Sequence, residues 1–223
     1  MRCDAEWLGN ALARLSNDDL SPLLNLGAST RRYREVEQPH IHELVFRPLE
    51  ARGVTIVHAD IKAGDGVDIA GDIFDDSGFA RLKAVRPHAV ICGHMFEHVR
   101  DREALSRRLL ELLPERGLFF VTVPSSYHEH NDPIDTMFRP SPAELAALFP
   151  GQQILEATEL VGETYWAYVA QRPLVLPLRH VARFFVPFLG LREWQRSMRK
   201  LYWLAHRYRV SAIVGRKTAA EPG

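Results

Sequence analysis

The chain has 223 residues, of which 46% are hydrophobic and 25% charged, and its formal net charge is zero. This composition argues against a disordered tail or a mini-protein and fits one globular domain with a sizeable core. Cys3 and Cys92 lie far apart without a CxxC pair, which argues against a disulfide framework or a cysteine-rich zinc site. No apolar run approaches the ~18 residues of a membrane span. Asp4 and Trp7 stand where a signal peptide needs an uninterrupted apolar core, so we expect a cytoplasmic protein.

Strand-like and helix-like segments alternate along most of the chain. The predicted strands are 22–27, 54–60, 67–72, 87–93, 117–124, about 152–161 and 209–217. The predicted helices are 4–15, 40–53, 75–85, 101–113 and 141–149. This alternation predicts a doubly wound α/β domain over 1–223, with a mostly parallel, seven-stranded sheet covered on both faces. Pro48 requires a kink or a late start in its helix.

A basic, aromatic segment at 165–207 separates the last two predicted strands. Between 172 and 209 the chain has nine Arg or Lys residues and one acid, Glu193. Apolar residues recur there every three or four positions with basic residues between them: Leu191, Trp194, Met198 and Leu201 against Arg192, Arg196, Arg199 and Lys200. This spacing predicts an amphipathic helix with a basic face.

Two interpretations of this segment stay open. It is either a helical insert that packs on the core or forms a lid or dimer face, or a contact with an anionic membrane surface or a phosphate-bearing acceptor. Nucleic acid is disfavoured because no recognisable reading module accompanies the basic charge. Membrane contact through 172–209 would place the protein at the inner face of the membrane.

Glycines and polar residues stand where the first four predicted strands end. These residues are Asn25, Gly27 and Ser29, then Asp60, then Asp72 and Ile73, then Gly93 and His94. In open parallel sheets the ligand lies beyond the carboxyl ends of the strands, and an acid after the second strand can accept from both hydroxyls of a ribose. A lone glycine before Ala28 and Ser29 argues against the pyrophosphate loop of NAD or FAD, whereas a nucleoside without phosphates has a gentler requirement.

These residues resemble the class I S-adenosylmethionine-dependent methyltransferases, in particular their small type 11-like bacterial branch. The matching motifs are LLNLGAS at 23–29, HAD at 58–60, VDIAGDIFD at 67–75, AVICGHMFEHVRDREALSRRLLELLPERGLFFVTVP at 89–124 and HNDPIDTMFRPSPAELAALFPG at 130–151. Asn25 stands where the family pattern has an acid, and Ser29 stands where it has a further glycine. The resemblance covers about residues 22–162.

The resemblance implies S-adenosylmethionine as the cofactor and a role for each strand end. Gly27, in the motif with Asn25 and Ser29, would pass beside the methionine end, and Asp60 would hold the ribose hydroxyls. Asp72 and Ile73 would border the adenine, and Gly93 and His94 would lie near the sulfonium. The implied reaction is methyl transfer, with oxygen of a small molecule, sugar or lipid-linked glycan as the expected acceptor. The rival is a catalytically silent methyltransferase-like domain whose basic insert binds a partner or an anionic membrane.

Histidines are the candidate bases, because histidine titrates near neutral pH without special help. We expect His94 or His128 in this role ahead of His98 and His130. The stretch HMFEH at 94–98 also fits the H-x-x-E-H zinc pattern, but it follows a strand and a glycine rather than lying on a long helix. His128, His130 and Asp132 could hold a divalent metal, although a solvated loop is the simpler interpretation. We therefore expect no metal.

Overall fold

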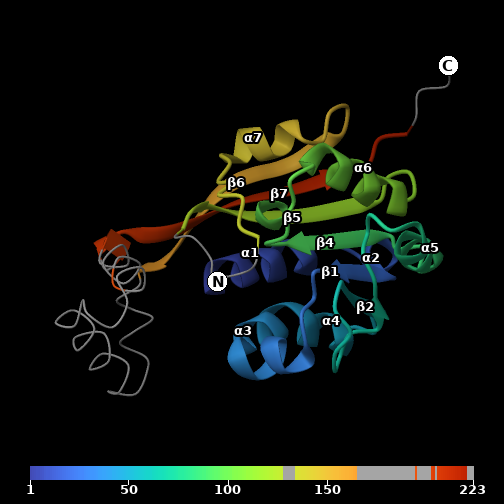
Figure 1. The fold of residues 1–223 in the computed structure, drawn as a ribbon. Helices are drawn as coiled ribbons and strands as arrows, with labels where there is room; N and C mark the ends of the chain where they lie inside the picture. The colour runs from blue at the N-terminus through green and yellow to red at the C-terminus, as the bar shows by residue number, and fades with distance from the viewer. Residues whose placement is uncertain (128–133, 165–193, 195–201, 204, 220–223) are drawn as a thin grey trace.

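The computed structural model describes residues 1–127, 134–164, 194, 202–203 and 205–219, and Figure 1 shows their arrangement. Seven strands form one sheet in the order β3-β2-β1-β4-β5-β7-β6. The strands are β1 (Leu23–Leu26), β2 (Ile56–Asp60), β3 (Ile69–Ala70), β4 (Ala89–Gly93), β5 (Leu118–Ser126), β6 (Gln153–Thr164) and β7 (Arg207–Arg216). Strands β3 to β5 pair in parallel, and β7 runs antiparallel to both of its neighbours. The predicted mostly parallel, seven-stranded α/β sheet is confirmed.

Helices cover both faces of this sheet. They are α1 (Arg2–Ala13), α2 (Asn17–Leu20), α3 (Pro39–Ile41), α4 (Arg47–Ala51), α5 (Asp76–Ala84), α6 (Arg102–Leu112) and α7 (Pro142–Ala147), with the π-helical turns η1 (Tyr33–Glu37) and η2 (His42–Phe46) and the 3-10 turn η3 (Phe96–His98). One apolar cluster joins the sheet to α5, α6 and α7, and a second joins the opposite face to α1, η2 and α4 (Figure 1). The central strands are buried on both sides, as expected of a parallel sheet covered by helices.

The helix predicted at 40–53 runs from Pro39 to Ala51, and a π turn precedes each of its two prolines. A π turn precedes Pro39, where the amide of Gln38 donates to the carbonyl of Tyr33 at 2.8 Å. A second π turn, η2, precedes Pro48. A proline cannot donate to the carbonyl four residues earlier, and its ring crowds that carbonyl. The wider turn relieves this conflict, so the helical segment continues through Pro48 and does not start late.

Strands β6 and β7 pair as far as Thr164 and Arg207, beyond the last pairing of β5 with β7 at Ser126 and Arg209. Most of 165–207 lies outside the described residues, so the amphipathic helix stays a prediction. In the described part, Trp203 packs against Tyr208 with ring centroids 5.1 Å apart, and Tyr127 lies 4.5 Å from Tyr208. Within the residues described, no helix is long and apolar enough to cross a membrane.

Gly215 on β7 makes room for an aromatic stack in the core. It pairs with Phe119 of β5, whose ring stacks on Phe149 at 4.5 Å. A Cβ atom on Gly215 would overlap the Phe119 ring. Because cores tolerate little added volume, we expect Gly215→Ala to lower the free energy of unfolding by about 1–3 kcal/mol in urea titrations.

A double-mutant cycle tests this cause directly. In a Phe119→Leu background the ring is gone, so the added cost of Gly215→Ala should shrink. An unchanged cost in that background would contradict the steric explanation.

Candidate functional site

Strands β1 and β4 bring Gly27 and Gly93, two of the predicted site glycines, close together. Strand order reverses between β1 and β4, which is where ligands bind in open α/β sheets. Gly27 follows β1 with a positive φ of 70°, and a Cβ atom there would lie 3.9 Å from the carbonyl oxygen of Gly93 at the end of β4. The backbone after β1 thus passes close to the end of β4, in a conformation that favours glycine.

Asp60 ties the end of β2 to the loop after β1. Its Oδ2 accepts the backbone N–H of Ser29 at 2.8 Å, and its Oδ1 accepts that of Lys62 at 3.1 Å. Ser29, which stands where the family pattern has a glycine, has a φ of 53° and so lies in the left-handed region. An ionised carboxylate has about four acceptor sites. Asp60 therefore retains acceptor capacity for a ligand while it fixes the loop.

Arg34 of η1 clamps the same loop, and sequence reasoning missed it. The side chain donates from Nη1 to the carbonyls of Ala28 and Ser29 at 2.9 and 2.7 Å, and from Nη2 to that of Gly66 at 2.8 Å. Arg34 is only 5% exposed, and burial lowers the pKa of its guanidinium. The clamp joins the loop after β1 to the loop between β2 and β3. Nothing in the run of arginines from 31 to 34 marks this one as buried.

Asn25 is engaged by the neighbouring strand. It is 7% exposed, and its amide nitrogen lies 3.1 Å from Nδ1 of His58, its register partner on β2. Burial, together with the positive charge of Arg34, lowers the pKa of His58 to about 4. The imidazole is therefore neutral at physiological pH and can accept from the Asn25 amide. This pairing places a neutral hydrogen bond where the family pattern has an acid.

The end of β3 forms a tight turn that fixes Asp72. Its Oδ1 accepts the backbone N–H of Phe74 at 2.9 Å, and α5 approaches so closely that a Cβ atom on Gly78 would collide with the Asp72 carbonyl. Ile73 is buried in the core, whereas Phe74 is exposed. Asp72 remains partly exposed at the same edge of the sheet as Asp60.

His94 lies between two carboxylates at the end of β4. Its Nε2 is 2.6 Å from Oδ2 of Asp4 on α1, and its Nδ1 is 3.5 Å from Oε1 of Glu97. Burial lowers the pKa of His94, but the contacts with Asp4 and Glu97 outweigh this and raise it to about 9. His94 is therefore an imidazolium at neutral pH. In this geometry His94 keeps its proton. It is therefore unsuited to act as the base that the sequence predicted.

The two carboxylates are correspondingly held in their charged forms. Burial raises the pKa of Asp4, but the terminal ammonium at 2.7 Å and His94 bring it well below its usual range. Glu97 is fully buried, and His94 likewise outweighs burial and lowers its pKa. His94, Asp4 and Glu97 form a charge cluster, and Asp4 is the member that sequence reasoning missed. It lies 90 residues from His94 in the chain.

The loop after β5 docks on η3 beside this charge cluster. Nδ1 of His98 lies 2.6 Å from the carbonyl of Ile134, and both the amide and the hydroxyl of Thr136 donate to the carbonyl of Glu97 at 2.9 Å. His128, His130 and Asp132 of the same loop lie outside the described residues. No group of three His, Cys, Asp or Glu side chains that could hold a metal exists within the described part of the chain, which includes His94, Glu97 and His98.

Comparison with known proteins gives matches among solved structures alone. No family model and no curated protein matches the chain. The [4+2]-cyclase SpnF matches with a TM-score of 0.52 at 16% identity, covering 96% of this chain and 81% of that one. A SAM-dependent methyltransferase from Archaeoglobus fulgidus matches with a TM-score of 0.49 at 15% identity, covering 96% and 94%. Coclaurine N-methyltransferase, bound to N-methylheliamine and SAH, matches with a TM-score of 0.48 at 15% identity, covering 96% and 72%.

The sheet and the SpnF match together define the fold class. The sheet has the strand order β3-β2-β1-β4-β5-β7-β6 with β7 antiparallel, and the alignment with SpnF covers 96% of the chain. The chain therefore has the Rossmann-like methyltransferase fold that its motifs predicted. The bacterial branch stays a prediction.

Removing the Arg34 clamp tests its contribution to the loop. Arg34→Gln would leave up to three carbonyl oxygens without their charged donor, so we expect the free energy of unfolding to fall by about 2–4 kcal/mol in urea titrations. Arg32→Gln is the matched control, because Arg32 is exposed and its ion pair with Glu37 should contribute little. Equal losses in the two variants would contradict the clamp.

The charge on His94 predicts a defined pH dependence of stability. Its pKa is about 9 in the folded protein against an ordinary value of 6.5, so its contribution is complete below pH 6.5 and is lost as the pH rises through 9. The urea midpoint of the wild type should therefore fall over this range more than that of His94→Gln. An NMR titration of the His94 ring should give a pKa well above the ordinary value and show it drop in Asp4→Asn. A ring that titrates normally in the wild type would contradict the charge cluster.

Proposed function

We propose that the chain catalyses S-adenosylmethionine-dependent methyl transfer, with oxygen of a small molecule or glycan as the acceptor. The observation that carries this proposal is Asp60, a carboxylate with spare acceptor capacity at the end of β2, held against a loop that turns at Gly27 beside the end of β4. A nucleoside fits such an edge, because a carboxylate can take both ribose hydroxyls and a glycine lets the backbone approach.

The residues of the chain fit the cofactor at each strand end. Asp60 would hold the ribose, Asp72 would border the adenine beside Ile73 and Phe74, and Gly27 would leave space for the methionine end. Asn25 and Ser29 would act by shaping the loop, because their amide and backbone are already engaged within it. The bound cofactor supplies a methyl group on a positively charged sulfur, which is a good leaving group.

The charge cluster fixes the end of β4 beside Gly93, where the sulfonium would lie. His94, Asp4 and Glu97 together carry one net negative charge, and the terminal ammonium 2.7 Å from Asp4 balances it. Because His94 is protonated, we assign it the role of a positioning residue that fixes the end of β4. The base for a hydroxyl acceptor is then His128, as predicted from the sequence. The protein contributes orientation and proton removal.

The second candidate function is a catalytically silent methyltransferase-like domain. The observation that favours it is the neutral Asn25–His58 pair, which occupies the position of the family acid. In that case the basic segment at 172–209 would provide the function by contacting a partner or an anionic membrane surface. Turnover with a screened set of acceptors separates the two candidates.

The proposed cofactor site is tested by calorimetric titration with S-adenosylmethionine and S-adenosylhomocysteine. We expect micromolar binding, weakened about tenfold or more by Asp60→Asn, because the amide cannot accept both ribose hydroxyls and the loop amides. Asp65→Asn, an exposed acid in the next loop, should bind as the wild type does.

A ligand analogue separates ribose contact from loop order. If Asp60 holds the ribose, the wild type should bind 3′-deoxy-S-adenosylhomocysteine more weakly than S-adenosylhomocysteine. Asp60→Asn should then reduce the affinity for the deoxy ligand by a smaller factor than it reduces the affinity for S-adenosylhomocysteine. Strictly additive losses would show that Asp60 acts through the loop alone. No heat with either natural ligand in a folded sample would overturn the proposed cofactor.

A further inference from the structure

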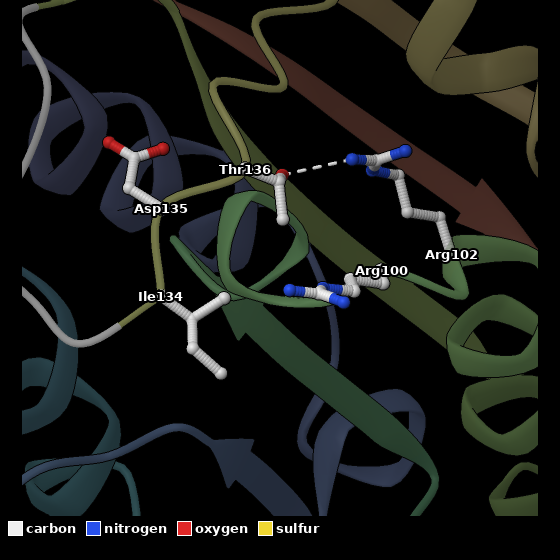
Figure 2. Close-up of a pocket in the computed structure, with 5 residues that line it drawn as sticks. All are labelled: Arg100, Arg102, Ile134, Asp135 and Thr136. Carbon is white, nitrogen blue, oxygen red and sulfur yellow. Dashed lines mark hydrogen bonds between the residues drawn. The ribbon is translucent and has the colours of Figure 1, made fainter.

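A cavity of about 460 Å³ lies beside the charge cluster, between η3 and the loop after β5. Arg100, Arg102, Ile134, Asp135 and Thr136 line it. Figure 2 shows Arg100 and Arg102 reaching toward the loop that carries the other three residues, with the Asp135 side chain directed away from both guanidinium groups. The cavity adjoins the proposed methyl-transfer site, because Thr136 bonds to the carbonyl of Glu97, which contacts His94.

Among the described residues, neither arginine of this cavity pairs with an acid. Arg102 donates from Nη2 to the hydroxyl of Thr136 at 2.9 Å and lies 4.1 Å from the Phe138 ring centroid. Its Nε is buried and has no hydrogen-bond partner. Arg100 is exposed, and within the described part of the chain neither guanidinium has a carboxylate within 4.0 Å. Two guanidinium groups thus border one cavity with no counter-charge from the part of the chain that the structure describes.

The acids nearest in sequence are committed to other groups. Asp135 receives Arg139 through both of its oxygens, at 3.2 and 2.8 Å. Asp101 accepts the N–H of Ala104 at the start of α6, at 2.8 Å. Glu97 is fully buried against His94. The positive charge at the cavity is therefore left for a ligand, and guanidinium groups suit oxyanions because their N–H groups match the oxygens.

We propose that this cavity binds an oxyanion group of the methyl acceptor, a phosphate or a carboxylate, through Arg100 and Arg102 with the hydroxyl of Thr136 beside them. The identification of the ligand as the acceptor rests on the proposed function, whereas the anion site itself does not. An anionic group held here would anchor the acceptor next to the end of β4. The acceptor is then a charged metabolite or a phosphate-bearing glycan, not a neutral molecule.

The test is calorimetric titration of the full chain with inorganic phosphate and, separately, with acetate, at matched ionic strength. Arg100→Gln should weaken binding about tenfold, and Arg102→Lys should weaken it less because the charge is kept and the planar fork is lost. Arg107→Gln on α6, an exposed arginine outside the cavity, is the matched control and should change binding less than about twofold. The anion that binds more tightly identifies the group.

The outcomes separate the anion site from the cofactor site. Anion binding that depends on Arg100 and not on Arg107, with S-adenosylmethionine affinity unchanged in Arg100→Gln, supports the proposal. No binding of either anion, equal losses in Arg100→Gln and Arg107→Gln, or a loss of S-adenosylmethionine affinity in Arg100→Gln would overturn it. Anion binding without any S-adenosylmethionine binding would overturn the proposed function and leave the anion site standing.

Discussion

The candidate site depends on the clamp by which Arg34 joins two loops through their backbone carbonyls. The loop after β1 carries a single glycine, so its conformation needs support from side chains. Ser29 occupies the left-handed region, which an L-residue adopts at a cost in free energy. Charge-assisted bonds from a buried guanidinium, together with the bond from Ser29 to Asp60, offset that cost. The protein thus fixes with side chains a loop for which the family pattern uses glycines.

The charge cluster around His94 holds the end of β4 in place. His94 itself has a positive φ, and its backbone N–H donates to Thr122 on β5 at 2.8 Å. The imidazolium bridges α1 to η3 through Asp4 and Glu97, so the N-terminal helix is bound to the edge where the ligand is expected. An isolated buried carboxylate such as Glu97 would be costly, and the proton on His94 compensates it.

The loop after β5 packs against this arrangement. It docks on η3 through hydrogen bonds to Glu97 and His98, and Thr136 of this loop also accepts a hydrogen bond from Arg102 at the start of α6. The proposed acceptor site and the positioning of His94 would then share the contact between this loop and η3. Under the two proposals, the cationic cavity would hold an anionic group at one end of the acceptor and leave the reacting atom at the other end free to approach the sulfonium.

The sequence by itself determined the sheet and the members of its carboxyl edge. Apolar strand runs alternating with helical spacing predicted the seven strands, and Gly27, Asp60, Asp72 and Gly93 could be placed together because parallel strands end at a common edge. The tertiary structure alone decided which arginine is the clamp, that Asp4 helps to keep His94 protonated, and that Arg100 and Arg102 have no acid partner among the described residues. These outcomes depend on burial and on contacts between distant parts of the chain. The spacing of residues in the sequence does not predict these contacts, because the charge state of a side chain is set by the groups that surround it after folding.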